Sequence, residues 1–102
     1  MRYLENIDIR EDEITEFCRR YPIRKLSLFG SVLRSDFNQV SDVDMLVEFQ
    51  ADARIDLFDM ADMEIELTEL LGRKVDLRTP EDLSHYFRQQ VMTTAQPLYE
   101  QK

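Results

Sequence analysis

Residues 30–44 read GSVLRSDFNQVSDVD, and this stretch carries the strongest signal in the chain. The pair Gly30-Ser31 ends an apolar run, and ten residues later Asp42 and Asp44 follow with one residue between them. Glycine lets a phosphate approach the backbone closely, and the start of a helix offers unpaired N–H groups to an anion. Carboxylate oxygens are the ligands that Mg²⁺ prefers. Gly30 and Ser31 are therefore candidates for holding a phosphate, and Asp42 and Asp44 for holding a metal.

The segment Asp42–Phe49 is predicted to be a strand, because it has the clearest alternation in the sequence. One face of this strand would carry Val43, Met45, Val47 and Phe49, and the other Asp42, Asp44, Leu46 and Glu48. Two carboxylates two residues apart on a strand lie roughly 6.6 Å from each other, and they repel unless a cation relieves them. The acidic pairs Glu11/Glu13 and Glu64/Glu66 fall in predicted helices, where such positions do not share a face.

A third carboxylate is predicted from the short strand Lys74–Leu77. Val75 and Leu77 are the expected core pair of this strand, so the side chain of Asp76 would point to the opposite face. Asp76 is therefore a candidate third metal ligand from a neighbouring strand. Phosphoryl-transfer sites often use two metal ions to steady the attacking and leaving oxygens.

The remaining patterns predict an α/β (α+β) fold, with a small mixed sheet of about three strands flanked by helices in one domain over residues 1–102. Helices are expected over residues 8–21 and 55–71, a strand over Ile23–Phe29, and a helical turn from Ser31. The apolar side of the helix at 55–71 is predicted to hold Leu57, Phe58, Ala61, Ile65 and Thr68. A last helix is expected to begin at Thr79-Pro80 and to turn Leu83, Phe87 and Val91 inward, before an extended piece at Leu98-Tyr99.

Composition limits the class of protein further. With 43% hydrophobic and 33% charged residues among 102, the chain is typical of a globular domain, and no apolar run approaches the length of a membrane span. The formal net charge of −8 disfavours direct binding to DNA, which calls for a basic face. One cysteine, Cys18, fits a reducing compartment, and the N-terminus is too acidic for a signal peptide, so we expect a cytoplasmic protein.

A family resemblance rests on Phe29-Gly30-Ser31, Arg34, Asp36 and Ser41-Asp42-Val43-Asp44, followed by apolar Met45-Leu46-Val47. These residues resemble the signature of the DNA polymerase β-like nucleotidyltransferase superfamily. The whole chain, including Leu70–Pro80 and Leu98-Tyr99-Glu100, is similar to the minimal nucleotidyltransferase antitoxins (MntA type) of HEPN/MNT toxin–antitoxin pairs.

This resemblance implies an enzyme, a protein adenylyltransferase with the minimal nucleotidyltransferase fold. It implies transfer of AMP from Mg·ATP to a tyrosine hydroxyl of a cognate HEPN ribonuclease toxin, with release of pyrophosphate and silencing of the toxin. Gly30 and Ser31 match the residues that hold the triphosphate, and Asp42 and Asp44 match the two metal-binding aspartates, with two Mg²⁺ ions expected. Asp76 matches the third carboxylate, which completes the metal site and can help to deprotonate the attacking hydroxyl.

Several alternatives stay open at the level of sequence. An antitoxin of net charge −8 could also neutralise a basic ribonuclease by tight binding without catalysis, and an oligomer with the toxin is compatible with either mode. Arg34 and Asp36 are interpreted as a local pair that shapes the loop, and the alternative is that Arg34 reaches the phosphates. Arg73 and Lys74 could contact a triphosphate or the toxin, or could belong to a solvated strand edge.

Overall fold

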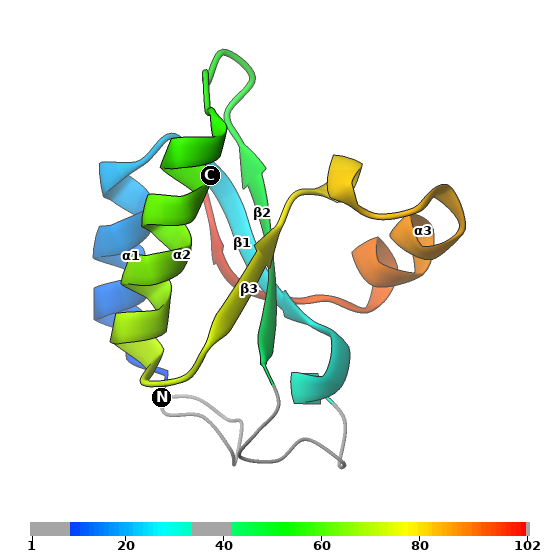
Figure 1. Ribbon diagram of the computed structural model, residues 1–102, viewed down its shortest axis with the longest axis horizontal. Coiled ribbons are helices and arrows are strands. Elements are labelled where there is room, and N and C mark those ends of the chain that lie inside the picture. Colours follow the sequence, from blue (N-terminus) through cyan, green and yellow to red (C-terminus); the bar gives the residue numbers. More distant parts are fainter. Residues whose placement is uncertain (1–8, 34–41, 102) are drawn as a thin grey trace.

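The computed structural model describes residues 9–33 and 42–101, whose arrangement Figure 1 shows. In chain order the elements are α1 (Glu11–Arg20), β1 (Ile23–Phe29), the 3-10 turn η1 (Gly30–Leu33), β2 (Val43–Phe49), α2 (Leu57–Leu71), β3 (Val75–Arg78), the 3-10 turn η2 (Pro80–Asp82), α3 (His85–Thr94) and β4 (Gln96–Glu100). The predicted class, a mixed sheet flanked by helices, is confirmed.

The strands form one four-stranded sheet in the order β3-β2-β1-β4. β1 pairs antiparallel with β2 and with β4, whereas β2 and β3 are parallel. A parallel pair needs a crossover connection, and α2 provides it. The predicted count of about three strands is wrong by one, because the extended piece near the C-terminus pairs with β1 as a full strand. Pro97 disfavours a strand in a sequence-based prediction, because proline cannot donate a backbone hydrogen bond, but a strand at the edge of a sheet tolerates it.

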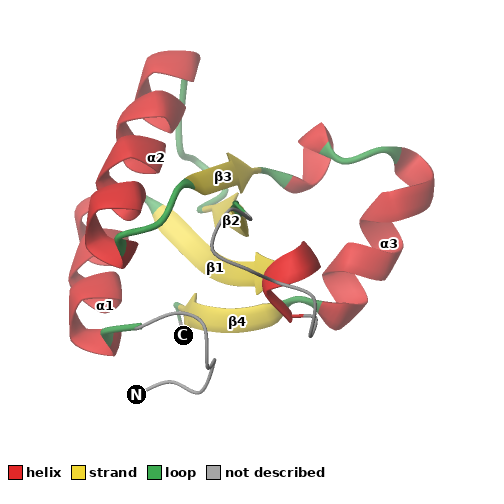
Figure 2. Cartoon of the chain, turned by 60° about the horizontal axis from the view of Figure 1, so that its bottom comes forward, coloured by secondary structure: helices red, strands yellow, loops and turns green. Residues whose placement is uncertain are grey.

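Helices α1 and α2 lie side by side on one face of the sheet, and α3 lies on the other side of it (Figure 2). The main core fills the space between the first two helices and the sheet, and it includes Ile14, Phe17, Cys18, Leu26, Leu28, Met45, Val47, Met63, Leu67 and Val75. Cys18 is 1% exposed and packs in this core from α1. α1 is shorter than predicted and begins at Glu11.

The predicted inward side of α2 is wrong. Leu57, Phe58 and Ile65 are 86%, 80% and 59% exposed, whereas the buried residues of α2 are Met63, Leu67 and Leu71. Apolar residues occur around much of this helix, so two stripes compete in the sequence, and the buried one follows the four-residue spacing 63, 67, 71. The helix begins at Leu57, two residues later than expected, and ends at Leu71 as expected, where Gly72 adopts a left-handed backbone (φ 69°) and its N–H donates to the Thr68 carbonyl at 2.9 Å.

A second, smaller core lies on the opposite face of the sheet and consists of Phe29, Leu46, Leu83 and Val91. The single helix predicted to cover this core is wrong, because the structure has two separate pieces there, η2 and α3. At the start of α3 the Ser84 Oγ accepts a hydrogen bond from the Phe87 N–H at 3.3 Å. The Arg88 guanidinium joins the two pieces by donating to the carbonyls of Pro80 (2.7 Å) and Leu83 (3.1 Å). Phe87 is 48% exposed, so its predicted inward position is wrong.

No helix within residues 9–33 and 42–101 is long and apolar enough to cross a membrane.

Candidate active site

The site begins where β1 ends at Phe29 and the chain turns at Gly30. Gly30 has φ +78°, a backbone conformation that favours glycine. Phe29 is the register partner of Asp44 on β2, so the turn begins directly beside that aspartate. A Cβ placed on Gly30 would lie 2.4 Å from the Asp44 Oδ2 and 3.2 Å from its Cγ. Gly30 is therefore required twice, once by its backbone and once by the space that the Asp44 carboxylate occupies.

Asp44 and Asp76 meet across the parallel pair of strands. They are direct register partners, and both are half-buried, while their strand neighbours Val43, Met45, Val75 and Leu77 are buried in the main core. The predicted alternation of both strands is thereby confirmed, and the two carboxylates come from the face that is turned away from α1 and α2. Asp42 is exposed and directly precedes β2, whose first N–H, on Val43, donates to the Lys74 carbonyl at 2.8 Å.

Both carboxylates line a pocket of about 260 Å³ between the sheet and α3. Its other lining residues are Phe29, Arg78, Asp82, Leu83, Ser84 and Phe87. Sequence reasoning did not place Arg78 and Asp82 in the site. Arg78 stands two residues after Asp76, so the strand periodicity that selected the carboxylate also puts Arg78 on its face. The position of Asp82 depends on the short turn η2, whereas the sequence pattern predicts one continuous helix there.

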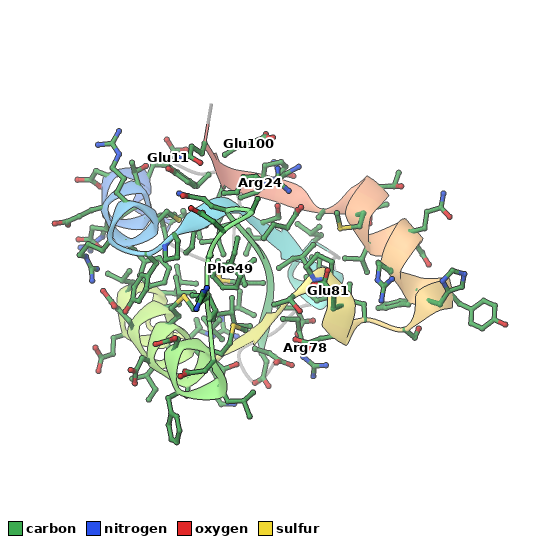
Figure 3. The ribbon with its side chains drawn as sticks, turned by 90° about the horizontal axis from the view of Figure 1, so that it is seen from above. Glu11, Arg24, Phe49, Arg78, Glu81 and Glu100 are labelled. Carbon is green, nitrogen blue, oxygen red and sulfur yellow. The ribbon has the colours of Figure 1, made fainter. Side chains whose placement is uncertain are left out.

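Arg78 holds Asp76 at two points. Its Nε donates to the Asp76 Oδ1 at 3.0 Å and its Nη2 donates to the Oδ2 at 3.1 Å. The hydrogen bond with Asp76 is the main reason why the pKa of Arg78 is raised, and the charges of Asp76, Asp44 and Asp82 add to it. Figure 3 shows Arg78 at the end of β3, reaching out from the edge of the sheet.

The donor set of this pocket fits a hard divalent cation, because carboxylate oxygens from two neighbouring strands converge on one face and Gly30 leaves room for one of them. Among the described residues, however, no group of three or more His, Cys, Asp or Glu side chains is arranged as a complete ligand set. Asp42, Asp44 and Asp76 as metal ligands therefore stay predictions.

Other candidates from the sequence lie elsewhere. The Ser31 side chain, Arg34 and Asp36 lie outside the part of the structure that is described. Lys74 is exposed and Arg73 is half-buried, and neither is among the residues that line the carboxylate pocket. Burial raises the pKa of Cys18 to about 12, so this thiol stays protonated at neutral pH and is no nucleophile.

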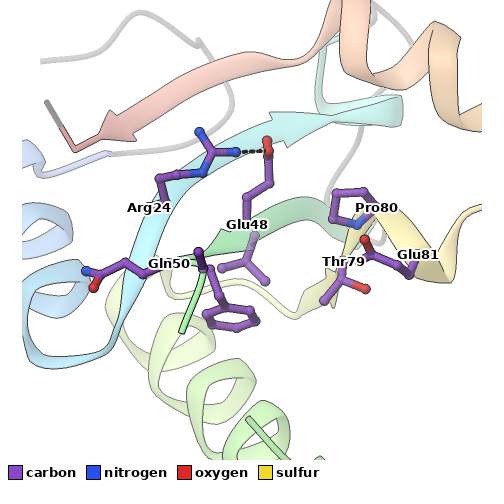
Figure 4. Close-up of a pocket in the computed structure, with 9 residues that line it drawn as sticks. Arg24, Glu48, Gln50, Thr79, Pro80 and Glu81 are labelled. Atoms are coloured by element: carbon purple, nitrogen blue, oxygen red, sulfur yellow. Dashed lines mark hydrogen bonds and ion pairs between the residues drawn. The ribbon is translucent and has the colours of Figure 1, made fainter. Parts of the chain in front are cut away.

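A separate pocket of about 310 Å³ lies at the carboxyl end of β2 (Figure 4). An ion pair between Arg24 and Glu48 crosses it, and Gln50, Thr79, Pro80 and Glu81 are among its lining residues. It contains none of the residues that the sequence singled out for phosphate or metal.

A third pocket, also of about 310 Å³, adjoins the carboxylate pocket and shares Phe29 and Phe87 with it. Its remaining lining residues are Gly30, Leu33, Gln90, Val91 and Thr94. Gly30 therefore lines the mostly apolar pocket while standing close to Asp44, which lines the acidic one.

Comparison with known proteins shows the family to which the chain belongs. The chain matches the family described as "Polymerase beta, Nucleotidyltransferase" over residues 12–102, and it belongs to this nucleotidyltransferase family. It is 29% identical over 90 residues to "Putative protein adenylyltransferase MJ0435" of Methanocaldococcus jannaschii, a match that covers 88% of this chain and 95% of that protein.

Two solved structures extend the comparison. The "Structure of putative minimal nucleotidyltransferase" has a TM-score of 0.72 and 33% identity, over 86% of this chain and 88% of that one. An MNT antitoxin in complex with the tri-AMPylated HEPN toxin of Shewanella oneidensis has a TM-score of 0.63 and 25% identity, over 89% of this chain and 70% of the compared chain. The predicted resemblance to minimal nucleotidyltransferases is confirmed.

Proposed function

We propose that this chain is an antitoxin, a single domain over residues 1–102, that transfers AMP from Mg·ATP to a tyrosine hydroxyl of a HEPN ribonuclease toxin in the cytoplasm. The observation that carries the proposal is the contact between Gly30 and Asp44. A turn suited to a phosphate lies against a carboxylate suited to a metal, and that carboxylate is in register with Asp76. Family membership and the AMPylated toxin in the related complex support the same reaction.

The reaction would form a bond between the acceptor oxygen and the α-phosphorus of ATP while the bond from the α-phosphorus to the bridging oxygen breaks. The acceptor hydroxyl loses its proton to a base, for which Asp76 is the candidate, and pyrophosphate leaves. Gly30 and the N–H groups at the start of η1, where Ser31 stands, would hold the triphosphate. In-line transfer of this kind is catalysed mainly by positioning and by electrostatic stabilisation.

Asp42, Asp44 and Asp76 are proposed as the residues that hold Mg²⁺. When bound, Mg²⁺ supplies positive charge that offsets the charge developing on the phosphate oxygens. The role of this chain is to keep the carboxylates on one face and close to the triphosphate. The strand register does so for Asp44 and Asp76, because a slip by one residue would turn either side chain into the main core.

The two adjoining pockets suit the two chemical halves of a nucleotide. The acidic pocket of about 260 Å³ would take the metal-bound phosphates, and the mostly apolar pocket of about 310 Å³ beyond Gly30 would take the nucleoside. Gln90 brings an amide that can donate and accept hydrogen bonds, and Phe87 lines both pockets.

A second mode of action, neutralisation by tight binding alone, is favoured by the net charge of −8, which suits a basic nucleic-acid-cleaving partner. The exposed apolar residues Leu57, Phe58 and Ile65 on α2 could add contact area. In this mode the carboxylates and ATP would be dispensable.

The test is the nucleotide dependence of toxin inhibition. The ribonuclease activity of a HEPN toxin is measured with wild-type protein, Asp44→Asn and Asp62→Asn, each with Mg·ATP or with an analogue whose α,β-bridge cannot be cleaved. Asp62 is an exposed carboxylate on α2, away from the pocket, and serves as the matched control. We expect inhibition by wild type and Asp62→Asn with Mg·ATP only. Full inhibition by Asp44→Asn, or with the analogue, would support masking and refute transfer.

A further inference from the structure

The outer side of α2 carries an apolar stripe that the fold leaves exposed. The stripe consists of Leu57, Phe58, Ala61 and Ile65, and each of these side chains is exposed in the described part of the chain. Their spacings of one, three and four residues place them on one side of the helix. Another side of α2 supplies its contacts with the sheet, so the stripe is not part of the main core. A contiguous exposed apolar surface marks a contact with another molecule.

The side of α2 next to the stripe faces the edge strand β3. The Thr68 Oγ1 accepts a hydrogen bond from the Val75 N–H at 3.1 Å, and the Glu64 Oε2 accepts one from the Leu77 N–H at 2.8 Å. These bonds occupy backbone N–H groups that an added strand would need. A partner at this side of the molecule is therefore expected to bind through side chains, as a helix does, and not by extending the sheet.

A hollow of about 300 Å³ adjoins the stripe between α2 and β3. Ile65 belongs to both the stripe and the hollow, and the other residues that line the hollow are Glu64, Thr68, Glu69, Lys74 and Val75. Anchoring side chains of protein partners fill pockets of this kind in an interface. The stripe and the hollow together suit an amphipathic helix that lies along α2 and inserts one side chain beside β3.

The charge around the stripe decides which helix fits. α2 contains five acidic residues and no lysine or arginine. Asp62 and Glu69 are exposed and follow Phe58 and Ile65 by four residues each, so they flank the stripe. A second copy of α2 would bring carboxylates against carboxylates, which disfavours self-association through this side. Lysine or arginine beside the apolar row of a partner helix would instead pair with these carboxylates.

We propose that the stripe and the hollow form a docking surface for a basic amphipathic helix of a partner protein. The partner's apolar side chains contact Phe58 and Ile65, and its lysine or arginine side chains lie beside Asp62 and Glu69. α2 covers one face of the sheet, whereas the carboxylate pocket lies on the face that α3 covers. A helix docked on α2 therefore leaves that pocket open, and the docking surface does not depend on the proposed transfer of AMP.

The experiment measures binding of synthetic helical peptides to the full chain by fluorescence anisotropy, without nucleotide. The first peptide has leucines at every third or fourth position, flanked by lysine and arginine. The second has the same leucines flanked by glutamate, and the third keeps the basic residues but has serine in place of leucine. We expect only the first peptide to bind, with an affinity that falls as salt is raised. Equal binding of the second or third peptide, or no binding of the first, overturns the inference.

Variants of the protein locate the bound peptide. Phe58→Ser should weaken binding of the first peptide about tenfold or more, a factor typical of burying one large apolar side chain. Glu69→Gln should weaken it about two- to fivefold, as one exposed ion pair does. The matched control is Met92→Ser, since Met92 is also exposed but belongs to α3, and this variant should bind as the wild type does. Equal binding by Phe58→Ser and Met92→Ser overturns the inference.

Sedimentation velocity of the protein alone tests the competing occupant, a second copy of this chain. We expect no self-association that Phe58→Ser changes, and a dimer that this variant dissociates would overturn the inference. Thermal melting of each variant ensures that a folding defect is not counted as a binding result. Failure of peptide binding leaves the proposed transfer of AMP intact, because that reaction is measured on the toxin.

Discussion

Replacing Gly30 by alanine tests how the turn and the carboxylate depend on each other. The left-handed backbone at φ +78° costs an L-residue roughly 1–2 kcal/mol. In a domain of this size that cost lowers the melting temperature by roughly 5–15 °C. The new Cβ would also lie 2.4 Å from the Asp44 Oδ2, and the carboxylate is the movable end of its side chain. We therefore expect it to rotate away, at small further cost in stability but with loss of its position.

The matched control is Gly72→Ala. Gly72 has a similar φ of +69°, but no atom lies within 4 Å of a Cβ built on it. Both variants should lose a similar amount of thermal stability, whereas only Gly30→Ala should lose AMP transfer, by about 100-fold, the usual consequence of a catalytic group displaced by about 1 Å. Thermal melting and transfer of labelled AMP to the toxin provide the two readouts. Equal transfer by the two variants would refute the argument that Gly30 exists to make room for Asp44.

Three further predictions concern stability. Burial raises the pKa of Cys18, so its neutral thiol stabilises the fold fully below about pH 9, and this contribution is lost as the pH rises toward the folded pKa of about 12. In denaturant titrations over that pH range, the unfolding free energy of Cys18→Ala should therefore fall less steeply than that of the wild type. A hydrogen bond from Arg20 lowers the pKa of Glu66, so the ionised carboxylate stabilises the fold at pH values above its ordinary pKa of 4.5, and this contribution is lost as the pH falls below it. In acid titrations, Glu66→Gln should therefore lose less unfolding free energy below pH 4.5 than the wild type, and an equal loss would contradict the role of this pair. Leu46→Ala should lower the unfolding free energy by about 2–5 kcal/mol in urea titrations, because Leu46 is buried in the smaller core. Leu57→Ala should change it by less than about 0.5 kcal/mol, because Leu57 is exposed, and similar losses in the two variants would contradict the assigned burial.

The strand alternation that the sequence predicts is confirmed, whereas the predicted inward side of α2 is wrong, and particular residues show the physical reason. Strand alternation has a period of two, so a single clear run such as Asp42–Phe49 determines which side chains share a face. The helix at 55–71 has apolar residues on more than one side, and only packing against the sheet selects Met63, Leu67 and Leu71 over Leu57 and Phe58. Periodicity cannot make that choice.

The partners of the site residues depend on contacts that a local pattern does not contain. The pairing of Asp44 with Asp76 requires β2 and β3 to be neighbours in register, and the pattern of each strand alone does not specify its neighbour. The two-point pair between Arg78 and Asp76 depends on which way a long side chain turns at the sheet edge. The strand β4 was expected only as an extended piece, because its pairing with β1 is a long-range contact.

The most direct measurement is the intact mass of a HEPN toxin after incubation with this protein and Mg·ATP, followed by peptide mapping of any modified residue. We predict an increase by whole AMP units on tyrosine, released pyrophosphate in equal amount, and no increase with Asp44→Asn. Neutralised toxin with unchanged mass would contradict the proposed transfer.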